Sequence, residues 1–101
     1  MNRRLELQKL FEELIGSKNV YYQPPESIKM SYPAIRYSKS KIDTKYANDS
    51  IYSKMTRYEV TVIAKSPDHP VIEKLLDLPY CSYDRTYTSD NLNHDVFTLY
   101  Y

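Results

Sequence analysis

The sequence predicts an α+β domain in which a mostly antiparallel sheet is covered by two helices. Apolar residues recur at helical spacing in two segments, and apolar and polar residues alternate in several others. The period also changes once, from strand to helix, between residues 57 and 78. Two apolar helix stripes are buried most simply against one sheet face. The expected order, α-β-β-(long loop or hairpin)-β-α-β-β, forms a single domain over residues 1–101.

The change of period separates a strand at residues 57–65 from a helix that begins near Val71. The apolar side of the strand carries Tyr58, Val60, Val62 and Ala64. Its polar side carries Arg57, Glu59, Thr61 and Lys65. In the turn at residues 66–70, Ser66 or Asp68 is expected to accept hydrogen bonds from the first helical amides. The helix ends before Pro79, and its apolar stripe is Val71, Ile72, Leu75 and Leu76.

The first helix is predicted over Arg3–Ile15, with Gly16 at its C-terminal cap. Its apolar stripe is Leu7, Leu10, Phe11, Leu14 and Ile15. Short strands are predicted at residues 19–23 and 32–38. Because Pro33 cannot donate to a strand ladder, it belongs at a strand start or a sheet edge. The expected core joins both helix stripes to Tyr58, Val60 and Val62 from the sheet.

Two further strands are predicted at residues 81–88 and 94–101, joined by a turn at residues 89–91. In the first of them, these residues are expected on one side: Cys81, Tyr83, Arg85 and Tyr87.

Residues 39–55 are polar, with few regularly spaced apolar residues, and a turn is predicted at residues 48–50. The segment is expected to be a projecting hairpin or a mobile loop that serves contact rather than the core. In the contact interpretation, an arm that is flexible in the free subunit orders against a partner. The expected contact residues are Ile42, Tyr46, Ile51 and Tyr52.

Composition excludes several classes of protein. The formal net charge is +1 with interspersed charges, so no strong field favours nucleic acid or an anionic membrane. A single glycine, Gly16, excludes the glycine-rich phosphate loops, and no cofactor is expected. No apolar run is long enough to cross a bilayer, and the amphipathic start does not resemble a secretion signal. Cys81 is the only cysteine, which excludes an intrachain disulfide and suits a reducing compartment.

Candidate catalytic and metal-binding residues are few. A metal set would need His69, His94 and Cys81 with Asp68 or Asp95, but their spacing matches no compact ligand motif. A nucleophilic pair of Cys81 and His94 is the other arrangement considered. A small buried thiol at a strand start is the commoner role for such a cysteine, so we expect neither a metal site nor an enzyme.

A nucleic-acid-binding module is the alternative function. Basic residues alternate with tyrosines from Lys39 to Tyr58, a pattern that could track phosphates and stack bases. Asp43, Asp49 and Glu59 dilute this charge, and the glycine-bearing signature of the common RNA-binding sheet is absent. Nucleic-acid binding is therefore the less favoured interpretation.

The order of elements resembles the small tail-terminator and tail-completion proteins of long-tailed bacteriophages and prophages. The resemblance covers nearly the whole chain. It depends on the helix LQKLFEELIG, the strand SYPAIRYS, a long polar hairpin region and the strand, Pro-Asp-x-Pro turn and helix at residues 57–78. Related head-tail joining proteins share much of this pattern.

The resemblance implies a non-enzymatic virion protein that is assembled in the cytoplasm of the bacterial host. Its subunits would form a ring, usually a hexamer, that caps the tail tube and ends its polymerisation. The implied partners are other copies of the chain, the tail-tube protein and the head-tail connector protein, with no membrane. The family has no catalytic residues, so the resemblance assigns no residue a role.

Overall fold

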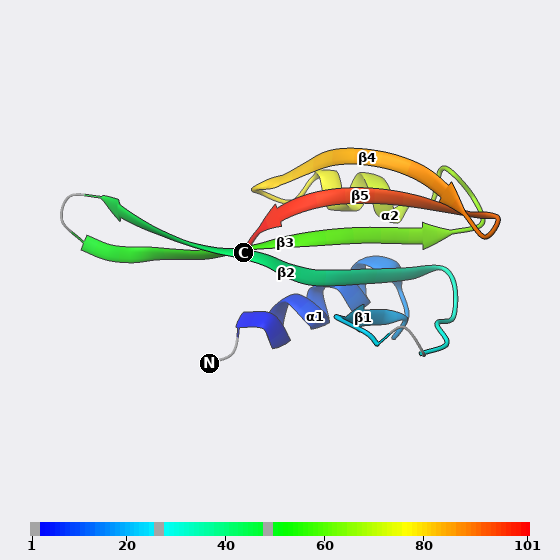
Figure 1. The fold of residues 1–101 in the computed structure, drawn as a ribbon, viewed down its shortest axis with the longest axis horizontal. Coiled ribbons are helices and arrows are strands. Elements are labelled where there is room, and N and C mark those ends of the chain that lie inside the picture. The colour runs from blue at the N-terminus through cyan, green and yellow to red at the C-terminus, as the bar shows by residue number, and fades with distance from the viewer. Residues whose placement is uncertain (1–2, 26–27, 48–49) are drawn as a thin grey trace.

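The computed structural model describes residues 3–25, 28–47 and 50–101, without the side chains of residue 3 and of residues 41–55. The described chain has an α+β fold in which one five-stranded sheet has the order β1-β2-β3-β5-β4 (Figure 1). Only the β1–β2 pair is parallel, so the predicted fold class is confirmed. In chain order the elements are α1 (Arg3–Ile15), β1 (Val20–Tyr22), β2 (Ala34–Ala47), β3 (Ser50–Ala64), α2 (Val71–Leu76), β4 (Cys81–Ser89) and β5 (Leu92–Tyr100).

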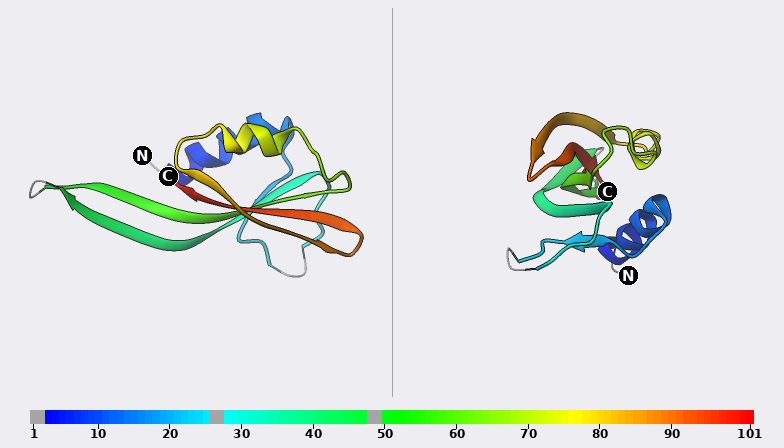
Figure 2. Two further views of the ribbon diagram at one scale, coloured as in Figure 1. Left: turned by 90° about the horizontal axis from the view of Figure 1, so that it is seen from above. Right: turned by 90° about the vertical axis from the view of Figure 1, so that its right-hand side faces the viewer.

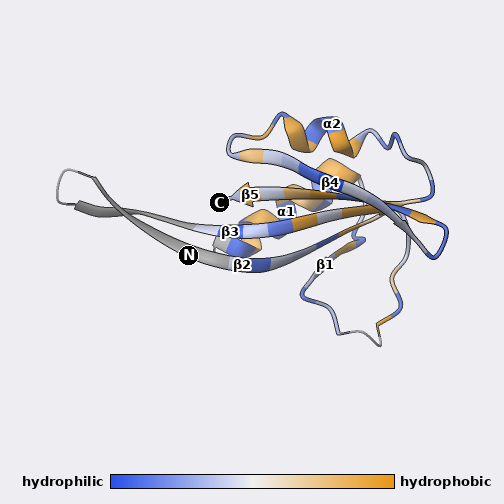
Figure 3. Ribbon diagram, turned by 45° about the horizontal axis from the view of Figure 1, so that its top comes forward, coloured by the Kyte–Doolittle hydropathy of each residue, from blue (hydrophilic) through white to orange (hydrophobic). Residues whose placement is uncertain are grey.

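Both helices lie on the same side of the sheet (Figure 2). Between them and the sheet is one hydrophobic core, and Figure 3 shows hydrophobic positions gathered in the helices and the neighbouring parts of β3 and β5. The helices contribute Leu7, Phe11, Val71 and Leu75, each fully buried. The sheet contributes Val20, Ile35, Tyr37, Tyr58, Val60, Val62, Phe97 and Leu99. The predicted core is therefore confirmed in most of its members, and Leu10, Leu14 and Ile72 pack at its border.

Leu76 is the member of the predicted core that is wrong, because it is 45% exposed. Helix α2 has only six residues, and Val71 and Leu75, four positions apart, point to the sheet. Leu76 is one position further along, about 100° around the helix from Leu75, and so lies beside the core.

The two sides of β3 differ less than its alternation predicts. Tyr58, Val60, Val62 and Ala64 are buried as expected, but Thr61, placed on the polar side, is also buried. Strand β3 lies between β2 and β5, and Thr61 pairs with Arg36 on one side and Val96 on the other. A central position in a sheet buries even the side that the helices do not cover.

The start of α2 is not capped by Ser66 or Asp68, so that expectation is wrong. The Ser66 hydroxyl accepts a hydrogen bond from the Asp68 amide, which lies before the helix. The first helical amide, that of Val71, instead donates to Nδ1 of His69 at 3.1 Å. Pro70 precedes the helix and needs no hydrogen-bond acceptor for its nitrogen.

The β4–β5 hairpin has the turn that was predicted at residues 89–91. Ser89 pairs with Leu92, and both residues between them have positive φ, 52° at Asp90 and 62° at Asn91. Asp and Asn adopt this conformation more readily than most residues, which favours a two-residue hairpin turn.

The expected alternation in β4 is interrupted by a shift of register. Tyr83 pairs with Phe97 but Arg85 pairs with the next residue, Val96. Two residues of β4 therefore oppose one step of β5, as in a β-bulge, and Arg85 changes side relative to Tyr83. The expectation that Cys81, Tyr83, Arg85 and Tyr87 share one side is wrong for this reason.

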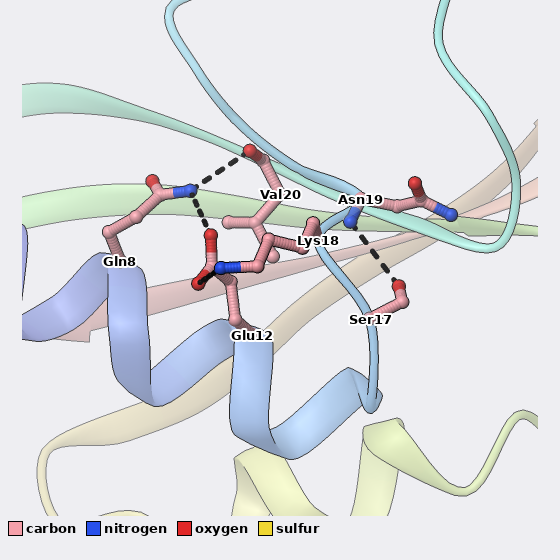
Figure 4. A network of polar contacts seen from close by, with 6 residues as sticks. All are labelled: Gln8, Glu12, Ser17, Lys18, Asn19 and Val20. Carbon is pink, nitrogen blue, oxygen red and sulfur yellow. Dashed lines mark hydrogen bonds and ion pairs between the residues drawn. The ribbon is translucent and has the colours of Figure 1, made fainter.

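Polar contacts tie the end of α1 to β1 (Figure 4). The side-chain amide of Gln8 donates to the Val20 carbonyl at 3.0 Å and to Glu12 at 3.2 Å. Glu12 also lies 3.8 Å from the Lys18 ammonium. Gly16, with φ of 77°, ends the helix as expected, and its amide donates to the Glu12 carbonyl.

Candidate contact surfaces

The most distinctive feature of the backbone is the far half of the β2–β3 hairpin, which projects beyond the rest of the sheet (Figure 1). Pairing of β3 with β5 ends at Arg57 and Tyr100, and the Tyr101 amide then donates to the Thr56 carbonyl. Residues 41–47 and 50–55, called the arm below, pair with no other described element. The Cα atoms extend over 49 × 24 × 22 Å.

The four predicted contact residues all belong to the arm. Ile42 pairs with Thr56, while Tyr46, Ile51 and Tyr52 lie where the register shifts between Lys45 and Ala47. Of the two alternatives for this segment, the structure has the hairpin. The centre of the predicted turn, residues 48–49, lies outside the described residues, as do the side chains of the four contact residues.

A second surface, which the sequence analysis missed, is the outer edge of β4. This strand pairs with β5 only, and every residue from Ser82 to Ser89 is exposed. Three tyrosines of this region are partly or largely exposed: Tyr80 (69%), Tyr83 (45%) and Tyr87 (38%). A strand with tyrosines but no large aliphatic residue was the signal available in the sequence.

A third feature is a depression of about 460 Å³ beside the start of α2. The residues that matter for its chemistry are Asp68, His69, Ile72, Glu73, Tyr83 and Asp95. Asp95 is only 7% exposed, and the Tyr83 hydroxyl donates to its Oδ1 at 2.9 Å. Desolvation and then this carboxylate raise the pKa of Tyr83, so the hydroxyl stays a donor at neutral pH.

The structure separates Cys81 from His94. Cys81 pairs with Leu99 and packs against the helix-covered core. His94 is five positions from Leu99 along β5, so its side chain points to the opposite face of the sheet, where it stacks on Tyr87. The two side chains do not form a nucleophilic pair. Burial also raises the pKa of the Cys81 thiol, which lowers its thiolate fraction.

Among the metal candidates, only Asp68, His69 and Asp95 meet, around the depression described above. Among the residues described, no group of three or more His, Cys, Asp or Glu side chains is arranged to hold a metal ion. In the same part of the chain, no helix is both long and apolar enough to cross a bilayer.

The basic residues of the alternative nucleic-acid surface are described only at its two ends. Lys39 is exposed, and the Arg57 guanidinium donates to the Ser40 hydroxyl at 3.2 Å. The other basic side chains, those of Lys41, Lys45 and Lys54, lie outside the described ones.

No family model, curated protein or solved structure matches this chain.

Proposed function

We propose that this chain is a non-enzymatic structural protein of a bacteriophage or prophage tail. It caps the tail tube, ends tube polymerisation and joins the tail to the head connector. In the particle its copies form a ring, a hexamer by the resemblance described above. The observation that carries this proposal is the arm, a two-stranded ribbon that leaves the body with both backbone edges unpaired by described residues.

The physical argument concerns what such a ribbon needs. An isolated two-stranded hairpin is marginally stable in water and gains from a partner that adds strands or covers a face. Tyrosine and isoleucine at positions 42, 46, 51 and 52 would contribute contact area at small entropic cost. In a closed ring the same contact repeats between every pair of neighbours, so a weak contact is sufficient.

Assembly with a tail-tube protein tests the proposal directly. The tube protein encoded in the same genome is polymerised with and without this chain, and tube lengths are measured by electron microscopy. We expect shorter tubes that end in a ring, and we expect this effect to disappear when residues 43–55 are replaced by Asn-Gly. Tubes of unchanged length, with no chain bound to their ends, would overturn the proposal.

Hydrogen exchange then locates the contact. Amides of residues 39–55 should exchange more slowly in the assembled tail than in the free chain, while core amides change little. The nucleic-acid alternative predicts a different result: DNA binding whose affinity falls steeply with salt, because phosphate contacts release counterions. Such binding, without affinity for the tube protein, would favour the alternative.

A further inference from the structure

The depression beside α2 contains a buried carboxylate with incomplete pairing. Asp95 is 7% exposed and receives one hydrogen bond, from the neutral Tyr83 hydroxyl to Oδ1. Its second oxygen, Oδ2, accepts no hydrogen bond from any residue that the structure describes. Because burying a charge without a partner is costly, this oxygen is a ready acceptor for a cationic group.

The other charged residues around the depression have the same sign as Asp95. Asp68 and Glu73 are exposed at its rim, and neither forms an ion pair with a described residue. His69 accepts the Val71 amide through Nδ1, which requires that nitrogen to be unprotonated and leaves the ring neutral. No described lysine or arginine lines the depression. Three carboxylates therefore converge without a cation from the described part of the chain.

The arm has the opposite charge in the sequence. Residues 41–55 include Lys41, Lys45 and Lys54 against Asp43 and Asp49. The turn before α2, which lines the depression, lies at the end of the body away from the arm (Figure 1). One molecule thus has a basic projection at one end and an acidic depression at the other.

We propose that the depression receives a lysine side chain from the arm of a second copy of this chain. Contact between two different surfaces of identical subunits is heterologous, the kind that generates a ring when the rotation closes. The inference rests on the arm contact of the proposed function and adds its receiving site: Asp95 at the base, with Asp68 and Glu73 at the rim.

The experiment uses the full-length chain labelled with ¹⁵N and a synthetic peptide of residues 39–57 as the probe. We expect saturable chemical-shift changes at the amides of Asp68, Glu73, Tyr83 and Asp95. A second peptide, with glutamine in place of Lys41, Lys45 and Lys54, should bind roughly three- to ten-fold more weakly because the ion pairs are lost.

Two variants of the labelled chain separate the site from general attraction. Glu73→Gln lies at the exposed rim, and Asp95→Asn keeps an oxygen that accepts the Tyr83 hydrogen bond; each should weaken binding of the wild-type peptide. Glu13→Gln, on the exposed surface of α1, is the matched control and should leave the affinity unchanged. Equal affinity for both peptides, equal effects of all three variants, or no shifts around the depression would overturn the inference.

Failure of this inference is distinguishable from failure of the proposed function. Peptide binding at the depression without any effect on tube length would support the contact between copies and contradict the tail role. Tube capping without peptide binding at the depression would do the reverse.

Discussion

The body and the arm are made from the same two strands, yet they are built differently. Near their body ends, β2 and β3 lie against helices, and Ile35, Tyr37, Val60 and Val62 are completely buried. Beyond Ser40 and Thr56 the same strands continue as a ribbon that pairs only with itself among the described residues. Strand pairing alone therefore does not indicate where the stability of this protein comes from. Burial against the helices provides it in the body, and the arm remains available for contact.

The largest effect on this comparison is expected from the core of the body. Leu75→Ala should lower the free energy of unfolding by about 2–5 kcal/mol, because it removes buried methyl groups and leaves a cavity. Leu76→Ala, one position away in the same helix and 45% exposed at present, should change it by less than about 0.5 kcal/mol. Urea unfolding of both variants measures the difference, and equal losses would mean that α2 does not face the sheet in this way.

The contrast between Leu75 and Leu76 also shows how much the sequence predicts. Apolar spacing was sufficient to predict both helices, the five strands and most of the core. It placed Leu76 in the core because a stripe read from spacing alone does not show how narrow the contact of a six-residue helix is.

Other details depended on contacts between distant residues. The register shift after Tyr83 follows from pairing with β5, and the His69 cap follows from a ring nitrogen placed near the Val71 amide. Alternation in one strand shows neither of them. The depression is a stronger example, because Asp68 and Asp95 lie 27 positions apart and meet only when α2 packs beside β4 and β5.

The second prediction concerns the polar contact that crosses from α1 to the sheet. The Tyr37 hydroxyl donates to Oε1 of Gln8 at 2.6 Å, and its ring packs on Phe11 at 5.0 Å between centroids. Burial raises the pKa of this hydroxyl, although the nearby Arg4 guanidinium lowers it in part, so the donor proton is retained at neutral pH. Tyr37→Phe should cost about 1–3 kcal/mol, because it leaves the partly buried Gln8 oxygen without this donor.

Tyr80→Phe is the matched control, since Tyr80 is 69% exposed and its hydroxyl faces water. It should leave the urea midpoint nearly unchanged. If both substitutions have the same effect, the hydrogen bond between α1 and the sheet contributes nothing measurable to the body.

The third prediction concerns the end of α1. Gly16 has φ of 77°, and a Cβ added there would meet no atom within 4 Å. Gly16→Ala should therefore destabilise the body by about 1 kcal/mol through backbone strain alone. Gly16→Asn should lose less, because asparagine tolerates this conformation better. Thermal unfolding ranks the variants, and an alanine variant as stable as the wild type would show that the helix end adopts another conformation.

The smallest effect on stability is expected from the arm. Replacing residues 43–55 by Asn-Gly keeps the Ile42–Thr56 pair and the Tyr101–Thr56 hydrogen bond, and it closes the strands with a turn that suits their twist. The free energy of unfolding should change by less than about 0.5 kcal/mol, because the removed residues contact no part of the core. A loss of several kcal/mol in urea unfolding would show that the arm supports the body. An unchanged body that no longer caps tubes would place the contact function in the arm, and this result would separate the two regions most sharply.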